Sequence, residues 1–195
     1  MYKERCSWVT KDPLYIKYHD EEWGNPVYND QKLFEMLSLE GAQAGLSWLT
    51  ILKRRENYRR AFDDFDPIKI SAYSEEKINQ LINDKEIIRN KLKIRSVVTN
   101  AKAYLKVQEE FGSFSNYLWK FTGGKPILND WSSQEEIPTS TKESKQLSND
   151  LKKRGFKFVG PVICYAFMQA VGMVNDHTKD CFLYYKNNVQ NKNGN

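Results

Sequence analysis

Two histidine–cysteine pairs, one near each end of the chain, are the residues best suited to binding a metal ion. His177 and Cys181 are four positions apart in "MVNDHTKDC", so one helical turn would direct both side chains at one ion. Cys6 and His19, in "CSWVTKDPLYIKYH", include the only other histidine of the sequence. Together the two pairs provide the Cys₂His₂ ligand set that zinc favours.

The residues alone leave metal binding open, because the spacing is not that of a zinc finger and a single histidine–cysteine pair usually has no metal. Four protein ligands would leave no position for water, so such a site would be structural and would join the two ends of the chain. The third cysteine, Cys164, lies in the apolar segment "PVICYAFMQA" and is expected to pack in the core.

A second pattern, "LKKRGFKFVGPVICYAFMQAVG", predicts a basic helix, a short link and an apolar helix. Gly155 ends the first helix, and Gly160 precedes Pro161 at the start of the second. The free N–H groups of a helix start suit a DNA phosphate, and Lys157 adds positive charge beside them. A plain helical connection with a solvated basic face fits the spacing equally well.

An acid and an indole define a third candidate site. Glu40 shares a helical face with Leu33 and Leu37, which suggests partial burial, and Trp48 follows after "GAQAGLS". The two side chains would form a pocket near the ends of consecutive helices. The alternative is that Glu40 is a solvated residue at a helix end.

These candidates must be positioned by helices, because the apolar periodicity is helical almost throughout and no alternating strand pattern occurs. The sequence predicts an all-α protein. Asp66–Pro67 and Ser74 are typical helix starts. The expected helices are 30–41 (ended by Gly41), 46–62, 66–74, a segment from 74, 90–111, 114–121, 144–154 and 161–172, with a loop at 122–142.

Composition limits the class of protein. The chain has 195 residues, 40% of them hydrophobic and 13% aromatic, which suffices for one helical domain over residues 1–185 with two lobes beside a cleft. Residues 186–195 are too polar to pack and are expected to be a disordered tail. Neither a signal peptide nor a membrane-length apolar run occurs, so we expect a soluble cytoplasmic protein. A net charge of +5 is compatible with nucleic acid without being diagnostic.

Most of residues 4–181 resembles the DNA-3-methyladenine glycosylase I family of bacterial base-excision enzymes. The matching stretches are "ERCSWV", "DPLYIKYHDEEWG", "KLFEMLSLEGAQAGLSWLTILKRRENYR", "IPTS", "LKKRGFKFVGPVICYAFMQA" and "VNDH". The resemblance implies a helix–hairpin–helix glycosylase fold. It also implies one structural zinc bound by Cys6, His19, His177 and Cys181.

The same resemblance implies a pocket for an alkylated adenine. Glu40 would recognise the base, with at most a secondary catalytic role, and aromatic residues would form the walls. Indole and phenol faces suit the positive charge of such a base. The implied pocket walls are Tyr18, Trp48, Trp8 and Tyr15; the implied DNA contacts are Gly45 and the plug Leu46, with Gly155, Lys157 and Gly160 of the hairpin.

The catalytic aspartate of the wider superfamily is replaced here by Asn175, and the register of Asp176 would direct it elsewhere. The polar "VND" is expected to turn the chain out of the core toward the metal. We expect a monomer that acts on double-stranded DNA, releases free 3-methyladenine by hydrolysis and has no lyase activity. The alternatives are a glycosylase for another alkylated base and a zinc-stabilised DNA-binding module without catalysis. A zinc hydrolase of small molecules would need an open metal position.

Overall fold

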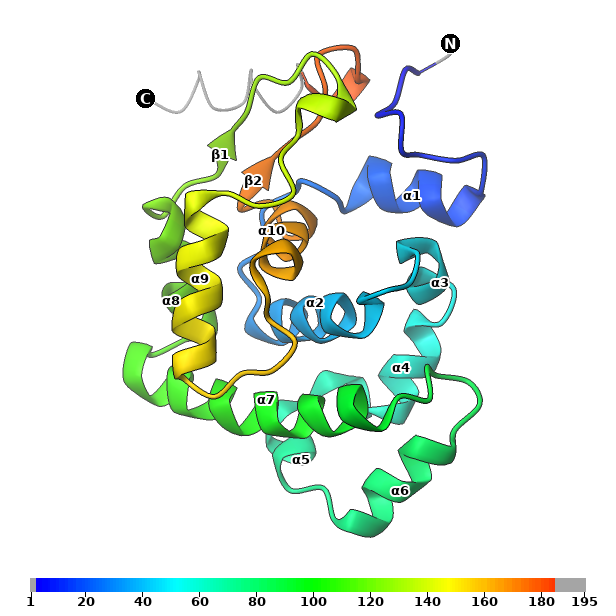
Figure 1. Cartoon of the computed structure of the whole chain (residues 1–195), viewed down its shortest axis with the longest axis vertical. Helices are drawn as coiled ribbons and strands as arrows, with labels where there is room; N and C mark the ends of the chain where they lie inside the picture. The colour runs from blue at the N-terminus through cyan, green and yellow to red at the C-terminus, as the bar shows by residue number, and fades with distance from the viewer. Residues whose placement is uncertain (1–2, 185–195) are drawn as a thin grey trace.

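The computed structural model describes residues 3–184, and the prediction of an all-α protein is confirmed over this range. Figure 1 shows α2 and α10 in the middle of the molecule, with the other helices around them. The helices are α1 (Pro13–Glu21), α2 (Asp30–Gln43), α3 (Trp48–Leu52), α4 (Arg55–Ala61), α5 (Pro67–Ser71), α6 (Glu75–Asn83), α7 (Lys91–Phe111), α8 (Phe114–Trp119), α9 (Lys142–Lys153) and α10 (Pro161–Ala170), with short 3₁₀ turns η1 (Asp63–Phe65), η2 (Lys120–Thr122) and η3 (Gln134–Glu136).

Helix α2 is central because its middle is buried on every side. Residues 33–42 are all buried, as expected for a helix whose apolar residues are not confined to one stripe. The expectation that Gly41 ends this helix is wrong, since the helix continues to Gln43. A Cβ at Gly41 would lie 3.4 Å from Cβ of Phe158, so the missing side chain lets the α9–α10 link pass close to α2.

Two further elements differ from the sequence predictions. The segment 46–62 is not one helix, because it breaks between α3 and α4. Helix α1 was not predicted, although Asp12 caps it by accepting from the N–H of Leu14 at 3.0 Å and Pro13 occupies the first turn. The same Asp-Pro signal correctly predicted α5, which Asp66 caps.

Two very short strands also occur within the described residues. Strands β1 (Ile127–Leu128) and β2 (Val174–Asn175) pair in parallel, with Ile127 opposite Val174. Two residues are too few to produce an alternating pattern. The pairing matters because it attaches the 122–142 segment to the chain just before His177.

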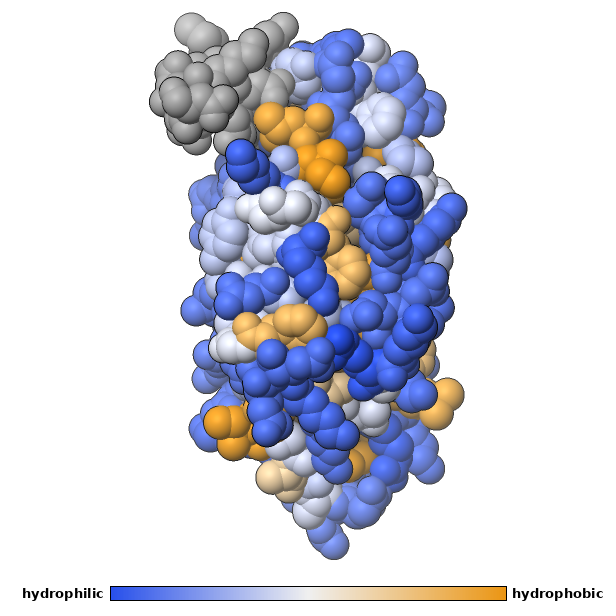
Figure 2. Space-filling model, turned by 90° about the vertical axis from the view of Figure 1, so that its left-hand side faces the viewer, coloured by the Kyte–Doolittle hydropathy of each residue, from blue (hydrophilic) through white to orange (hydrophobic). Residues whose placement is uncertain are grey.

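The N-terminal and C-terminal segments lie side by side at the top of Figure 1, where the N–H of Phe182 donates to the carbonyl of Glu4 at 2.9 Å. Cys164 is buried in α10 as predicted, and burial raises the pKa of its thiol to about 12. Figure 2 shows that the face carrying α8 and α9 is mainly hydrophilic, with small separate apolar patches. No helix in the described part of the chain is long and apolar enough to cross a membrane. The predicted tail at 186–195 lies outside the described residues.

Candidate active site and metal centre

The two terminal histidine–cysteine pairs meet in the interior. Their ligand atoms lie within 4.8 Å of one another, and all four side chains are buried: Cys6, His19, His177 and Cys181. Sγ of Cys6 and Sγ of Cys181 are each 3.5 Å from Nδ1 of His177, and Sγ of Cys181 is also 3.5 Å from Nε2 of His19. Zn–S and Zn–N bonds at a tetrahedral angle would separate sulfur from nitrogen by about 3.6 Å. The cluster therefore fits a tetrahedral metal ion.

Hydrogen bonds outside the cluster orient both imidazoles. Nδ1 of His19 lies 2.8 Å from Oδ1 of Asp20, and Nε2 of His177 lies 3.3 Å from the carbonyl oxygen of Trp23. Each ring thus has one nitrogen bonded outward and the other facing the cluster, which is the usual arrangement around protein-bound metals. Arg5 in turn holds Asp20 through a pair of hydrogen bonds at 2.7 and 2.8 Å.

The local structure of the C-terminal pair differs from the prediction. His177 and Cys181 do not lie on a helical turn; they are brought together by a loop in which the N–H of Cys181 donates to the carbonyl of Thr178 at 2.8 Å. The polar "VND" segment does not leave the core either, since Asn175 is 7% exposed and Asp176 is fully buried. The ligands converge as expected, but through an irregular buried segment.

Asp176 explains how a polar segment can stay buried. Its Oδ1 accepts from Nδ2 of Asn129 at 2.7 Å and from Nε1 of Trp131 at 2.8 Å. Its Oδ2 accepts from the hydroxyl of Tyr165 and from Nε2 of Gln169, both at 2.7 Å. Four donors satisfy the carboxylate, and Asp176 is not among the residues that line the pocket described below.

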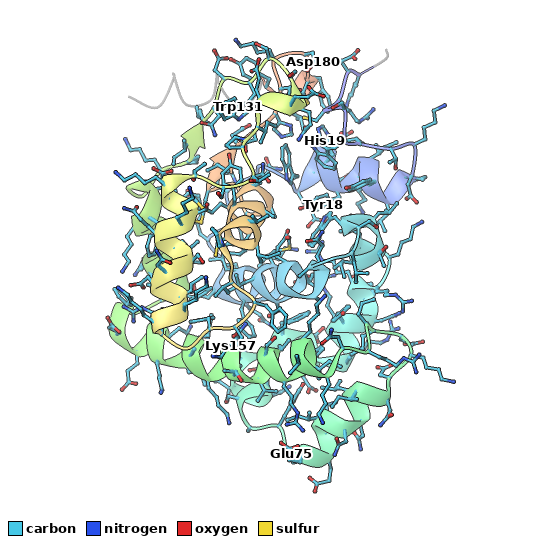
Figure 3. All side chains as sticks on the ribbon, viewed as in Figure 1. Tyr18, His19, Glu75, Trp131, Lys157 and Asp180 are labelled. Atoms are coloured by element: carbon cyan, nitrogen blue, oxygen red, sulfur yellow. The ribbon has the colours of Figure 1, made fainter. Side chains whose placement is uncertain are left out.

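Glu40 and the four predicted aromatic residues share one pocket. The cavity measures about 200 Å³, below the roughly 300–1,000 Å³ of pockets for drug-sized ligands, and so suits a single heterocycle. Figure 3 shows Tyr18 on α1 directed toward the interior. The predicted lining residues are all present, namely Glu40, Tyr18, Trp48, Trp8 and Tyr15; Trp23, Gln43, Gln134, Ala166 and Gln169 complete the wall.

The aromatic rings contact one another around the cavity. Ring centroids are 5.0 Å apart for Trp8 and Tyr15 and 5.6 Å apart for Tyr18 and Trp48, in tilted arrangements. The indole nitrogens of Trp8 and Trp48 are buried and have no hydrogen-bond partner among residues 3–184. Since buried N–H groups are normally paired, both are available to a ligand.

Two buried glutamates on α2 have opposite surroundings. Glu35 accepts from Nε of Arg55 at 2.6 Å and from Arg59 at 2.8 Å. Glu40, only 4% exposed, makes no hydrogen bond or ion pair within the described residues, and burial raises its pKa to about 8. A carboxyl group kept in a pocket without a partner is a common mark of a functional site.

The predicted DNA contacts lie in two connections. Gly45 and Leu46 follow α2 in a turn that Lys93 secures, because its Nζ donates to the carbonyls of Ala42 and Ala44 at 2.9 and 2.6 Å. Leu46 is 36% exposed.

Gly155, Lys157 and Gly160 form the link between α9 and α10, and Figure 3 places Lys157 beside α7. Asn100 fixes this link through two hydrogen bonds. Its Oδ1 accepts from the backbone N–H of Lys157 at 2.8 Å, and its Nδ2 donates to the carbonyl of Lys157 at 3.1 Å.

Sequence reasoning missed three glutamine side chains and Trp23 in the pocket wall. Gln43 lies one turn after Glu40 on α2, so helical spacing could have found it. Gln134 belongs to the 122–142 segment, which carried no periodic signal. Asn175 is absent from the pocket wall; its Oδ1 accepts from the N–H of His177 at 3.2 Å.

Comparison with known proteins gives a consistent result. The family model for methyladenine glycosylases matches residues 8–184. The chain is 53% identical to DNA-3-methyladenine glycosylase 1 of Escherichia coli K12 over 181 residues, covering 93% of this chain and 97% of that protein. It is 50% identical to a DNA-3-methyladenine glycosylase of Haemophilus influenzae over 177 residues, covering 91% and 96%.

Solved structures agree with this match. A crystal structure of 3-methyladenine DNA glycosylase I superposes with a TM-score of 0.90 at 53% identity, covering 92% of this chain and 98% of the other. A structure of 3-methyladenine DNA glycosylase I from Staphylococcus aureus, determined to explain 3-methyladenine recognition, has a TM-score of 0.89 at 42% identity and covers 91% and 95%.

Proposed function

The chain belongs to the methyladenine glycosylase family, and we propose that it removes 3-methyladenine from double-stranded DNA by hydrolysing the N-glycosidic bond. The observation that carries this proposal is the unpartnered, buried Glu40 inside an aromatic pocket of single-base size. The relatives named for this activity support the choice of substrate.

Recognition depends on the charge of the damaged base. An adenine alkylated at N3 in DNA is cationic, and the faces of Tyr18 and Trp48 attract it by stacking and cation–π contact. The same positive charge favours the ionised form of Glu40, whose pKa burial raises to about 8. A neutral adenine gives Glu40 no such compensation, so the pocket prefers the damaged base.

Bond cleavage needs little help from the protein, because the alkylated base leaves as a neutral molecule. Glu40 therefore acts mainly in recognition, with at most a secondary role in catalysis. Asn175 cannot act as a general base. The proposed reaction is hydrolysis that leaves an abasic site in an intact strand.

Duplex binding uses two connections, the turn that carries Gly45 and Leu46 and the link between α9 and α10. The target base must leave the DNA helix to reach Glu40, and Leu46 beside Gly45 would fill the gap; its exposure of 36% supports this role. The start of α10 at Gly160 presents free N–H groups to a phosphate, with Lys157 adding charge. An ideal Cβ at Gly160 would meet no atom within 4 Å, so the position is open to a close neighbour.

The Cys₂His₂ group would hold zinc as a structural ion. Four protein ligands complete a tetrahedron, and thiolate and imidazole are the ligands zinc prefers. Cys6 and His19 would thereby be joined to His177 and Cys181. We further propose that residues 1–185 function as one two-lobed monomer in the cytoplasm.

Chromatography of bases released from methylated DNA tests the function. We expect free 3-methyladenine in the soluble fraction, with untreated DNA giving no release. The strand should remain intact until alkali cleaves the abasic site. Release of only other methylated bases would overturn the substrate assignment. DNA binding without release of any base would show that the protein is a DNA-binding module without catalysis.

A further inference from the structure

The segment between β1 and α9 contributes one side chain to the pocket, Gln134 on the short turn η3. Asp176 holds this segment through the side chains of Asn129 and Trp131. The carbonyl of Trp131 also accepts from the N–H of Lys179 at 2.9 Å. Figure 3 shows Trp131 at the end of the molecule that carries the C-terminal segment. The contacts fix the segment, so Gln134 is held at the pocket by a buried anchor.

The side-chain carbonyl of Gln134 is buried and accepts no hydrogen bond within the described residues. Besides the carboxyl group of Glu40, four buried side-chain polar atoms lack a partner among residues 3–184, and three of them belong to residues that line this pocket. They are Nε1 of Trp8, Nε1 of Trp48 and Oε1 of Gln134. An unpaired buried polar group is destabilising, so a concentration of them at one cavity indicates a ligand with matching groups.

The matching groups are those of adenine. Its exocyclic amino group donates two hydrogen bonds, and its ring nitrogens accept. Glu40 from α2 and Gln134 from η3 provide two acceptors, while the two indoles provide donors. A guanine has a carbonyl oxygen in place of the amino group. That oxygen is itself an acceptor, so it could not form a hydrogen bond with the acceptors of Glu40 and Gln134.

We propose that Gln134 is a specificity-determining residue whose side-chain carbonyl accepts a hydrogen bond from the amino group of the alkylated adenine, and so disfavours alkylated guanine. This inference rests on the proposed function. In this proposal, the 122–142 segment recognises one edge of the base through Gln134.

Two methylated substrates test the effect, since 3-methyladenine and 3-methylguanine in DNA are both cationic but have different groups at C6. Guanine also has an amino group at C2, so the effect of Gln134 is read from the change in the ratio of the two rates between wild type and variants. The measurement is the single-turnover release of each base by the wild-type protein, by Gln134→Leu and by Gln134→Glu. Leucine removes the hydrogen-bond acceptor and has a similar size. Glutamate keeps an acceptor at this position, because both of its carboxylate oxygens accept, whereas only one end of the glutamine amide does. Glu135→Gln is the matched control, because Glu135 is an exposed neighbour on the same turn.

Gln134→Leu should slow the release of 3-methyladenine roughly three- to tenfold, as expected for one neutral hydrogen bond. It should leave the release of 3-methylguanine unchanged or faster, so the preference for adenine falls. Gln134→Glu should keep the preference, and Glu135→Gln should match the wild type.

Equal slowing of both bases by Gln134→Leu would show a purely structural role and overturn the inference, as would an unchanged ratio. Loss of the preference in Gln134→Glu would also overturn it. A wild-type protein that releases no 3-methyladenine would instead contradict the proposed function itself.

Discussion

Replacing Glu40 by glutamine should stabilise the protein while weakening base binding. In the native state burial raises the pKa of Glu40 from 4.5 to about 8, whereas the unfolded chain ionises near the ordinary value. Glutamine has nearly the same shape as the protonated acid and never ionises. The substitution therefore removes the free-energy penalty of ionising a buried, unpartnered carboxyl group.

The magnitude and its pH dependence follow from linkage. Between pH 4.5 and 8 the native state keeps a proton that the unfolded state has lost, so the free energy of unfolding falls as the pH rises. At about 1.4 kcal/mol per pKa unit the loss is about 3 kcal/mol at pH 7 and about 5 kcal/mol above pH 8. Glu40→Gln should lack this slope.

Urea unfolding of both proteins between pH 6 and 8.5 measures the difference directly. The advantage of Glu40→Gln should grow by about 1.4 kcal/mol per pH unit and level off near pH 8. Effects of the metal ligands are common to both proteins and cancel. Parallel pH profiles would show that Glu40 is already ionised in the native state, and the reasoning would fail.

Binding should change in the opposite direction. Above pH 8, where Glu40 is ionised in the native state, titration with free 3-methyladenine should show a loss of about 1.5–3 kcal/mol in Glu40→Gln, the value of a hydrogen bond to a charged group. Single-turnover excision should remain measurable. A variant that binds the base normally but excises nothing would identify Glu40 as the catalytic base.

Four other predictions test the remaining parts of the site. Purified protein should carry about one zinc per chain, and Cys181→Ser should lose metal and melting temperature together; a metal-free protein of unchanged melting temperature would contradict the metal site. Gly160→Val should fold normally but bind damaged and undamaged DNA about tenfold less tightly or worse, because phosphate contacts carry no sequence information; altered free-base binding would contradict this. Trp48→Ala should reduce free-base affinity by ~1–3 kcal/mol in the same titration. Lys93→Met should lower the free energy of unfolding by about 1–2 kcal/mol, measured in urea, because it uncaps the end of α2.

The sequence supported the metal ligands and the pocket through residue types rather than through local structure. Cys6 and His177 could be assigned to one site because the chain has so few histidines and cysteines, although His177 and Cys181 do not lie on the predicted helical turn. Glu40 was found because it shares a helical face with Leu33 and Leu37, which are fully or almost fully buried.

Other features could not be read from local patterns. Gln134 reaches the pocket only because Asn129 and Trp131 bond to a carboxylate far along the chain. The burial of Asp176 likewise depends on donors from four separate residues. These donors are not visible in the local sequence, so the polar "VND" segment was wrongly predicted to leave the core. Tertiary hydrogen bonds of this kind leave no periodic signal.

The metal cluster and the pocket are parts of one arrangement because they share α1. Tyr18 and His19 are adjacent on this helix (Figure 3). Tyr18 lines the pocket, while Nε2 of His19 lies 3.5 Å from Sγ of Cys181. The ring of Trp8 lies 5.3 Å from that of His19 and also lines the pocket. A structural ion that joins the chain ends would therefore also fix one wall of the pocket.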